Sequence, residues 1–569
     1  MSIRRKIYLP PDSETGERGL PPDCTSLLRN MRARVMTQGA MPNLPWSMSQ
    51  IDALPASFLI LLIGIGATLL LFWRLGDGSL ATWDEAIYGR VAREMVWSGD
   101  WLTPRWNSEA WFEKPPLMMW ITAAFFQLFG ISEFWTRVAS ASCGVGTIII
   151  TYLLASNLYG SAVGAISVAV LATSEHFIWS ARVGMLDTPL TLLTMIALYG
   201  YMRFESSDYR RWYVIWIACG AAIMTKSAAA LIIPVTITLT VVMDRQVLRT
   251  IQSVHFWTGA VVAALVAAPW HILMFLKYGQ DFFYEYVTYH VFQRATTEAF
   301  GHLHTRYFVG QTLYEYFYPW CFLIPAALLF AVAEILRGQS RSRVLLLEII
   351  LVSALYTSTT NAIHWYFVPI YPALAILIAV VMVEAIRSPM GLSFWAVWLS
   401  AFLAGPAAPI KFFVLVVPCL ALALAKREQT HLLAAGCALF LIVVGAYEMR
   451  PLYSRPVEPA AILASTAERK DVADRKELLL FPERLWWSAA IVAFYSDRTI
   501  QQASTVADLG ALLDGGRALP ILLPNSEVAD VAQCCALHIQ ARAGDLVYGT
   551  LRKSVTNEND SGSNASSPG

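Results

Sequence analysis

Long runs of apolar residues, separated by short polar segments, constrain this chain more than any other feature. A helix needs about 20 apolar residues to cross a bilayer, and the first such run covers 56–73. Only 15% of the 569 residues are charged, against roughly 25% in a soluble globular chain. We therefore expect an all-α polytopic membrane protein with about 13 spans, at 56–73, 137–156, 161–179, 188–203, 212–225, 228–243, 255–276, 315–336, 344–359, 365–386, 392–405, 409–425 and 430–447.

Basic residues predict how these spans are oriented, because Lys and Arg concentrate on the cytoplasmic side of a membrane. Residues 1–50 form a polar, basic arm that we expect to be cytoplasmic and disordered. If the later basic clusters also lie inside, the spans alternate without conflict. The outer, periplasmic face then carries 74–136, 180–187, 277–314, 360–364 and the chain after 448.

The apolar stretch 115–130 does not fit this alternation. If it crossed the membrane, Asp187 would lie inside, whereas Arg210 and Arg211 would lie outside. We therefore interpret it as an interfacial or re-entrant helix on the outer face. The transmembrane domain is expected to cover 51–449.

The chain after 450 has a different composition. Apolar runs at 477–481 and 518–523 alternate with polar helical stretches, which is typical of a small α/β domain. We expect a soluble periplasmic domain at 450–556 and a disordered Ser/Asn/Gly-rich tail at 557–569.

The first outer loop carries two adjacent acids, Asp84 and Glu85, followed by Tyr88 and Arg90. Acids also favour the first turn of any helix, so catalysis and helix initiation are both open here. Further along the loop, Glu113 and Lys114 precede a pair of prolines. Such a lysine binds a phosphate as a point charge or merely extends to the interface.

Later segments add an acid and several aromatic stretches with embedded polar groups. Asp187 lies at the mouth of a span, although Asp-Thr-Pro is also a good helix start, and capping alone is the simpler interpretation. His290 and Arg294 lie in the 277–314 loop, and His364 and Tyr366 begin another span. Tyr and Trp are ordinary at membrane interfaces, whereas His and Arg within them are less so.

Together these features resemble the lipid-carrier-dependent glycosyltransferases of the GT-C class. The first outer loop reads W-D-E-x-x-Y, then R-E-M-x-x-S-G-D-W, then F-E-K-P, at 83–88, 93–101 and 112–115. This order is similar to that of the bacterial aminoarabinose transferases that modify lipid A, and more broadly to the protein O-mannosyltransferase-like family. The resemblance covers about 55–390, and Ile87 stands where the aminoarabinose transferases have Arg.

The resemblance implies roles for individual residues. It implies that Asp84, Glu85 and Asp187 are the catalytic acids, with Asp84 as general base or acceptor-positioning group. The carrier phosphate would be bound by Lys114, Arg294, Tyr88 and Arg90. Glu113 and His290 would meet across loops, as a hydrogen bond or a divalent metal site, and His364 and Tyr366 would support them.

The resemblance also implies the activity. A sugar would pass from an undecaprenyl-type phosphate to a lipid, glycan or protein acceptor, such as 4-amino-4-deoxy-arabinose to lipid A, or mannose to a protein. The nucleotide-binding glycine loops are missing from the sequence, which favours a lipid-linked donor. A membrane lipid or sugar transporter is the alternative of another class. It would place charges at the bilayer midplane, and Lys226 is a candidate, but the charge pattern places Lys226 at the outer face.

Overall fold

The structure is a computed structural model that describes residues 56–553 with gaps. The undescribed positions within that range are 82, 205–207, 294–295, 297–307, 360–361, 388–390, most of 392–454, 470–476, 483–484, 486–487, 497 and 514–517. The predicted basic arm, the predicted spans between 392 and 447 and the predicted tail lie outside the described residues.

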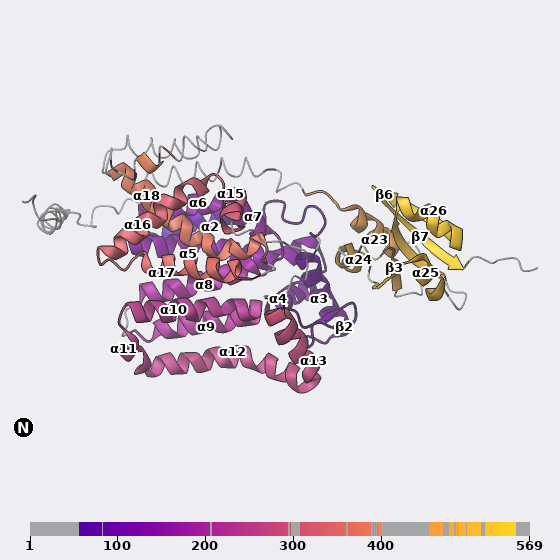
Figure 1. The fold of residues 1–569 in the computed structure, drawn as a ribbon, viewed down its shortest axis with the longest axis horizontal. Coiled ribbons are helices and arrows are strands. Elements are labelled where there is room, and N and C mark those ends of the chain that lie inside the picture. The colour runs from indigo at the N-terminus through magenta and orange to yellow at the C-terminus, as the bar shows by residue number, and fades with distance from the viewer. Residues whose placement is uncertain are drawn as a thin grey trace, which may run out of the picture. The chain divides into compact units, whose positions relative to one another are not determined.

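The described part before residue 388 is built almost entirely of helices, as the apolar runs predicted (Figure 1). In a helix, the backbone N–H and C=O groups of such an apolar run hydrogen-bond to one another, as they must in a bilayer, where no water is present to bind them. The long helices are α2 (Ala56–Phe72), α5 (Glu133–Tyr159), α6 (Ser161–Ala172), α7 (Glu175–Arg182), α8 (Asp187–Arg203), α9 (Arg210–Lys226), α10 (Ile232–Met243), α12 (Val254–Tyr278), α16 (Ile324–Leu336), α17 (Arg343–Thr357) and α18 (Tyr371–Arg387).

Four described helices are long and apolar enough to cross a membrane, at Glu133–Tyr159, Arg210–Met243, Val254–Tyr278 and His364–Ala385. A fifth candidate is the pair α6 and α7, which is bent by 70°. The predicted spans 212–225 and 228–243 lie in one long helical stretch, Arg210–Met243. The α-helical geometry of this stretch is broken at Ser227, whose φ is 43°. The 3-10 turn η2 (Ser227–Leu231) follows this interruption. The molecule is thus a helical membrane protein, and the predicted figure of about 13 spans stays a prediction.

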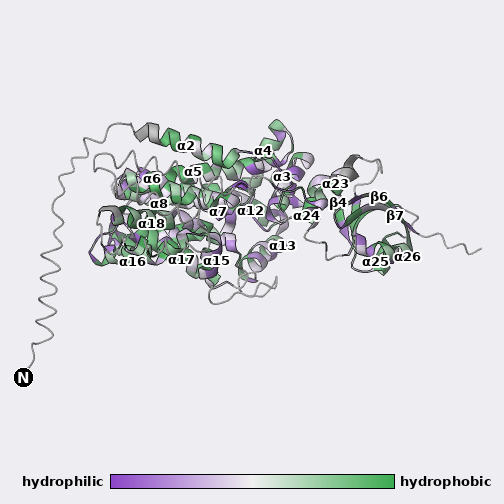
Figure 2. Ribbon diagram, turned by 90° about the horizontal axis from the view of Figure 1, so that it is seen from above, coloured by the Kyte–Doolittle hydropathy of each residue, from purple (hydrophilic) through white to green (hydrophobic). Residues whose placement is uncertain are grey.

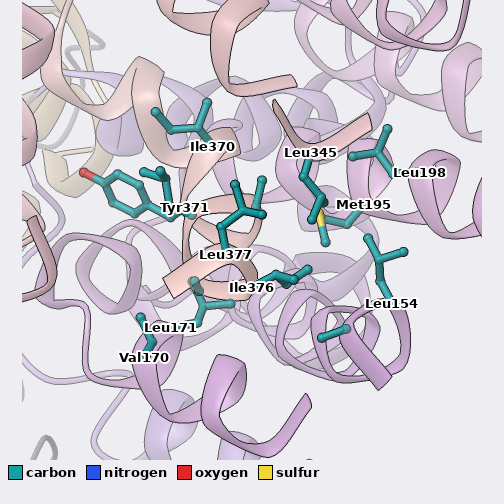
Figure 3. Close-up of a cluster of buried hydrophobic side chains, with 14 of the residues drawn as sticks. Leu154, Val170, Leu171, Met195, Leu198, Leu345, Ile370, Tyr371, Ile376 and Leu377 are labelled. Atoms are coloured by element: carbon teal, nitrogen blue, oxygen red, sulfur yellow. The ribbon is translucent and has the colours of Figure 1, made fainter. Parts of the chain in front are cut away.

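The core of this helical part lies around α18, whose residues are almost all inaccessible to solvent. Helix α18 packs against α6, α16, α17 and α5. Figure 3 shows buried side chains gathered around Ile376 and Leu377 of α18. Their neighbours come from several helices and include Leu154, Val170, Leu171, Met195, Leu198 and Leu345. Figure 2 shows α2 and α5 as mainly hydrophobic.

The segment between α2 and α5 contains shorter elements. Helix α3 (Asp84–Ser98) is followed by the two-residue strands β1 (Arg105–Trp106) and β2 (Glu109–Ala110) and by α4 (Leu117–Phe129). Gly99 ends α3 in the left-handed conformation that glycine adopts without strain. Helix α4 has 13 residues and is about 20 Å long at 1.5 Å per residue. By itself it is shorter than a bilayer of about 30 Å, and its interfacial position stays a prediction.

The predicted loop 277–314 contains α13 (Gln280–Phe283), the π-helix η3 (Tyr284–Gln293) and the start of α15 (Phe308–Tyr316). The 3-10 helices η4 (Trp320–Leu323) and η5 (His364–Ile370) precede α16 and α18, and the short helix α11 (Val247–Ile251) precedes α12.

The C-terminal region forms the predicted α/β domain around a five-stranded mixed sheet with strand order β4-β3-β5-β7-β6. Strands β4, β3 and β5 are parallel, and β7 runs antiparallel to both β5 and β6. The predicted apolar runs became β3 and β5. The strands are β3 (Glu477–Leu480), β4 (Thr499–Gln502), β5 (Leu519–Pro524), β6 (Cys535–Ala543) and β7 (Leu546–Lys553), and the helices are α23 (Pro459–Arg469), α24 (Ala489–Ser496), α25 (Val506–Leu512), α26 (Val528–Cys534) and the 3-10 turn η8 (Asn525–Glu527).

Alternating side chains of the strands face opposite sides of this sheet, because the side-chain period of a strand is two residues. Leu478 and Leu480 of β3 pack with α23, α24 and α3, whereas Leu479 packs with α25 and α26. Helix α3 therefore shares a hydrophobic core with the C-terminal domain. The C-terminal domain therefore packs directly against the helix that carries Asp84 and Glu85.

Candidate active site

Asp84 is the first residue of α3, and Tyr88 follows four residues later on the same face. The preceding residue, Trp83, has a φ of 75°, a conformation that residues other than glycine adopt at a cost. Tyr88 is buried, and its ring packs edge-on against Trp111 at 6.1 Å between centroids. The start of α3 therefore presents a carboxylate and a phenol side by side.

The environment of the Tyr88 hydroxyl shows which other groups lie nearby. Burial raises the pKa of Tyr88 well above its usual value, and the carboxylates of Asp84, Glu113 and Asp187 raise it further. Nearby negative charges disfavour ionisation of a phenol. Three acids that come from separate segments are therefore within electrostatic reach of one hydroxyl.

Lys114 brings a cation to the same place. Its Nζ lies 3.3 Å from Oε1 of the adjacent Glu113, and the two side chains are only 13% and 18% exposed. Lys114 is also within electrostatic reach of Asp187. The sequence predicted Lys114 as a phosphate ligand, and the structure places it beside Glu113 and within electrostatic reach of Asp187.

Asp187 is the first residue of α8, and its carboxylate forms a buried ion pair with Lys226 at the end of α9. The N-cap residue of α8 is Leu186, and Asp187 lies in the first turn of the helix, so the ion pair with Lys226 is a contact that Asp187 makes in addition to any role in starting the helix. The ammonium group of Lys226 also lies 4.4 Å from the centre of the Tyr366 ring, within range of a cation–π interaction.

Lys226 is the residue that sequence reasoning left out of the site. Its signal was visible: it is a lone cation in a long apolar run, and such residues are expensive in a membrane unless paired. Its pairing with Asp187 was not visible, because the two residues lie on different helices. We refer below to the Asp84 cluster, which consists of Asp84, Tyr88, Glu113, Lys114, Asp187, Lys226 and Tyr366.

Glu85 lies next to Asp84 in sequence but in a different environment. Its side chain is fully buried, and Oε1 accepts from Nε of Arg137 at 2.8 Å and from the backbone N–H of Gly184 at 3.0 Å. Oε2 accepts from the backbone N–H of Ala81 at 2.5 Å, and Nη1 of Arg455 lies 3.8 Å away. Burial opposes ionisation, but Arg137 and Arg455 outweigh it and lower the pKa of Glu85. Both oxygens of Glu85 are engaged with the protein.

Arg90, predicted as a phosphate ligand, contacts the C-terminal domain. Its Nε donates to Oε1 of Glu94 at 2.7 Å, and its Nη1 donates to the carbonyl of Ala493 at 2.5 Å. Arg93 donates in the same way to the carbonyl of Phe494. Both carbonyls are at the C-terminal end of α24, where the helix leaves carbonyls unsatisfied and favours cations. These contacts dock α3 on the C-terminal domain.

The predicted partners from the 277–314 loop are only partly described. His290 lies on η3, and the backbone N–H of Phe112 donates to Glu285 of the same element at 3.2 Å. The loop therefore meets the Glu113 segment. Arg294 lies outside the described residues. The described residues contain no group of three or more His, Cys, Asp or Glu side chains that suits a metal ion, and the divalent metal site stays a prediction.

His364 and Tyr366 are two residues apart on η5 but enter different environments. Tyr366 contacts Lys226, whereas Nδ1 of His364 lies 2.9 Å from Nε2 of His176. Tyr316 stacks on the His364 ring at 4.3 Å. Nδ1 of His176 is in turn 2.7 Å from the Tyr371 hydroxyl. The structure thus adds Tyr366 to the charged cluster and gives His364 a separate histidine partner.

The amino-acid sequence of the chain is similar to those of known proteins. Residues 113–273 match the family model described as dolichyl-phosphate-mannose-protein mannosyltransferase. A protein of Aquifex aeolicus is 26% identical over 451 residues, which are 77% of this chain and 87% of that protein. The undecaprenyl phosphate-alpha-4-amino-4-deoxy-L-arabinose arabinosyl transferase of Pseudomonas savastanoi pv. phaseolicola is 29% identical over 57% of this chain. That match spans 62% of the relative's own length.

Solved structures share the fold. ArnT from Cupriavidus metallidurans bound to undecaprenyl phosphate superposes with a TM-score of 0.69 at 20% identity, covering 87% of this chain and 98% of that one. The oligosaccharyltransferase of Archaeoglobus fulgidus superposes with a TM-score of 0.52 at 11% identity, covering 88% and 74%. The family model, the relatives and the shared fold agree with one another: they support a GT-C membrane glycosyltransferase that is similar to the ArnT-like enzymes, whose members use lipid-phosphate sugar donors.

Proposed function

We propose that this enzyme transfers a sugar from an undecaprenyl-type phosphate to a lipid, glycan or protein acceptor at the periplasmic face of the bacterial inner membrane. The observation that carries the proposal is the Asp84 cluster. It brings together acids, lysines and tyrosines from α3, the segment before α4, α8, α9 and η5. Buried charges of this kind are costly in a membrane protein and are functional by default.

The cations of the cluster suit a phosphate leaving group. In the donor the phosphate is a diester with one negative charge, and it gains a second as its bond to the sugar breaks. Lys114 and Lys226 would stabilise that growing charge, which lowers the barrier because the interaction strengthens in the transition state. The cluster holds three carboxylates and two ammonium groups. A further cation is therefore expected when the donor binds, and Arg294 remains our candidate.

Asp84 is the proposed general base. The acceptor oxygen attacks the anomeric carbon, the bond from that carbon to the phosphate oxygen breaks, and the carrier phosphate leaves with the electron pair. The acceptor proton passes to Asp84. A direct displacement of this kind inverts the anomeric centre. Asp187 holds Lys226 in place, and Tyr88 is a neutral phenol within electrostatic reach of the three acids.

The relatives suggest which substrates to test first. The named relatives transfer 4-amino-4-deoxy-L-arabinose from undecaprenyl phosphate, so we propose this donor, with lipid A as acceptor. Ile87 replaces the Arg of those enzymes, which favours testing other sugars in parallel. Protein O-mannosylation is the second candidate function, favoured by the family match at 113–273.

The orientation of the chain is part of the proposal. The N-terminus is cytoplasmic and the C-terminal domain periplasmic, because all basic clusters then lie inside. Reporter fusions after Arg343 and after Glu477 should report opposite sides of the membrane. The same side for both fusions would overturn the proposed orientation.

The function is tested with purified protein in proteoliposomes and undecaprenyl-phosphate sugars labelled in the sugar. We expect one donor to be consumed, with undecaprenyl phosphate released and label covalently attached to an acceptor fraction. Asp84→Asn protein of equal abundance serves as the control. Label that crosses the bilayer on an unchanged carrier, without covalent transfer, would instead favour the transporter.

A further inference from the structure

Glu85 connects the two segments that carry the proposed catalytic acids. It directly follows Asp84, and it binds the backbone N–H of Gly184, three residues before Asp187. It also binds the backbone N–H of Ala81 in the turn before α3. The position of this one carboxylate therefore sets the spacing between the two segments.

Arg137, a residue of α5, forms a buried ion pair with Glu85. Besides its bond to Glu85, its guanidinium donates to the carbonyls of Leu75, Asp77 and Ser79 at 2.7–2.9 Å. These carbonyls belong to the turn that links α2 to α3. Arg137 thus fixes the turn on which α3 begins.

Arg455 approaches Glu85 from another part of the chain. It lies in the segment that enters the C-terminal domain just before α23, and its Nη1 is 3.8 Å from Oε2 of Glu85. The same segment is packed tightly on the α2–α3 turn. A Cβ atom on Gly78 would clash with Cβ and the backbone carbonyl of Arg455, and the backbone N–H of Glu458 donates to Oγ of Ser79 at 3.0 Å.

Nη2 of Arg455 is buried and has no hydrogen-bond partner in the described part of the chain, although the side chain as a whole is 16% exposed. Burying a charge is costly unless an opposite charge balances it, and Glu85 is the carboxylate paired with it. Among the described residues, the carboxylate paired with Arg455 therefore lies in the segment that carries Asp84. We refer to Glu85, Arg137 and Arg455 as the Glu85 cluster.

We propose that Arg455 is a positioning residue for sugar transfer: through Glu85 it makes the geometry of Asp84 and Asp187 depend on the docked C-terminal domain. The inference rests on the proposed function and deepens it. Arg455 touches no reacting group in this scheme. It lies outside the 55–390 region that carries the sequence resemblance, so the family motifs do not include it.

The test compares Arg455→Ala and Arg455→Lys with Arg542→Ala, a control that removes an exposed arginine of the same domain. Donor turnover is measured with labelled undecaprenyl-phosphate sugar. We expect Arg455→Ala to lower kcat about 10- to 100-fold, because small misplacements of catalytic groups have effects of this size. KM for the donor should stay within about threefold of wild type, because Lys114 and Lys226 are unchanged. Arg455→Lys should recover part of kcat.

Hydrogen exchange gives a readout that does not depend on turnover. Arg455→Ala should speed exchange in the peptides that contain the amides of Ala81 and Gly184, and leave the interior of α5 unchanged. If wild-type protein transfers no sugar but this exchange pattern appears, the proposed function fails while the coupling stands. Turnover and exchange both at wild-type level in Arg455→Ala would overturn the positioning role. Equal loss of kcat and donor binding, with no gain in Arg455→Lys, would also overturn it.

Discussion

Two adjacent acids of one helix, Asp84 and Glu85, lie in clusters of opposite character. In the Glu85 cluster the carboxylate is inaccessible to solvent, and both oxygens already bind protein groups. In the Asp84 cluster three carboxylates lie near two ammonium groups and two phenols, and the Lys114 and Glu113 side chains keep partial exposure. The first arrangement is a closed structural contact, whereas the second keeps partly exposed charged side chains, which we propose as the groups that meet the substrate.

The difference shows that burial of charge does not by itself identify a catalytic site. Breaking a buried ion pair is strongly destabilising because a partner is left uncompensated. The fully buried Glu85–Arg137 pair should therefore respond to substitution mainly in stability, whereas the partly exposed Arg455 should act on turnover through the positions of Asp84 and Asp187. The Asp84 cluster should respond mainly in turnover or donor affinity. Four substitutions, taken from the largest expected effect to the smallest, test this contrast.

Asp84→Asn should give the largest effect. Asparagine is nearly isosteric but cannot accept the acceptor proton, and loss of a general base lowers the rate by roughly 10²–10⁴-fold. Donor binding and protein abundance should remain at wild-type level. The measurement is single-turnover transfer of labelled sugar. Asp77→Asn, a change in the partly exposed ion pair with Arg74 of the same segment, should have little effect. Full activity of Asp84→Asn would remove Asp84 from the catalytic residues.

Glu85→Gln should mainly lower stability, by about 3–5 kcal/mol, because Arg137 would lose its buried charge partner. Thermal unfolding in detergent measures this, with exposed Glu109→Gln as the control. The lowered pKa of Glu85 stabilises the wild type above the ordinary glutamate pKa of about 4.3. This contribution is lost as the pH falls through the lower folded-state value. The variant should lack it. Unchanged unfolding at neutral pH would contradict the closed structural role.

Lys114→Ala should weaken donor use about 10- to 100-fold, because a charge-assisted contact is worth roughly 1.5–3 kcal/mol. Lys114→Arg should retain part of the activity. The measurement is KM for the labelled donor together with binding of undecaprenyl phosphate. Lys277→Ala is the control, since Lys277 hydrogen-bonds Thr103 at 2.8 Å. Wild-type donor affinity in Lys114→Ala would show that Lys114 only extends to the interface.

Arg90→Ala should have the smallest effect on the donor, with KM changed less than about twofold, because its guanidinium binds Glu94 and the end of α24. Its effect should instead appear as easier proteolysis between α3 and the C-terminal domain, measured by limited digestion. A large rise in donor KM with unchanged proteolysis would return Arg90 to the phosphate site that the sequence predicted.

Much of the architecture could be predicted from the sequence because it depends on local patterns. Apolar runs indicated the helical membrane part, and alternating runs at 477–481 and 518–523 indicated strands of the C-terminal domain. The 115–130 stretch was separated from the spans by charge alone, and its interfacial position stays a prediction. The motifs of the first loop indicated the GT-C class before any contact was known.

The division of labour among the charged residues depended on tertiary structure. The sequence predicted Asp84 and Glu85 as a catalytic pair and Arg90 as a phosphate ligand. In the folded chain, Glu85 pairs with Arg137 and Arg455. Arg90 donates to the end of α24. The fold also pairs Lys226 with Asp187. Hydropathy and turn patterns are properties of neighbouring residues, so they can be seen in the chain itself. Whether a charge is neutralised or left available depends on partners brought from distant segments, and those distances exist only in the folded molecule.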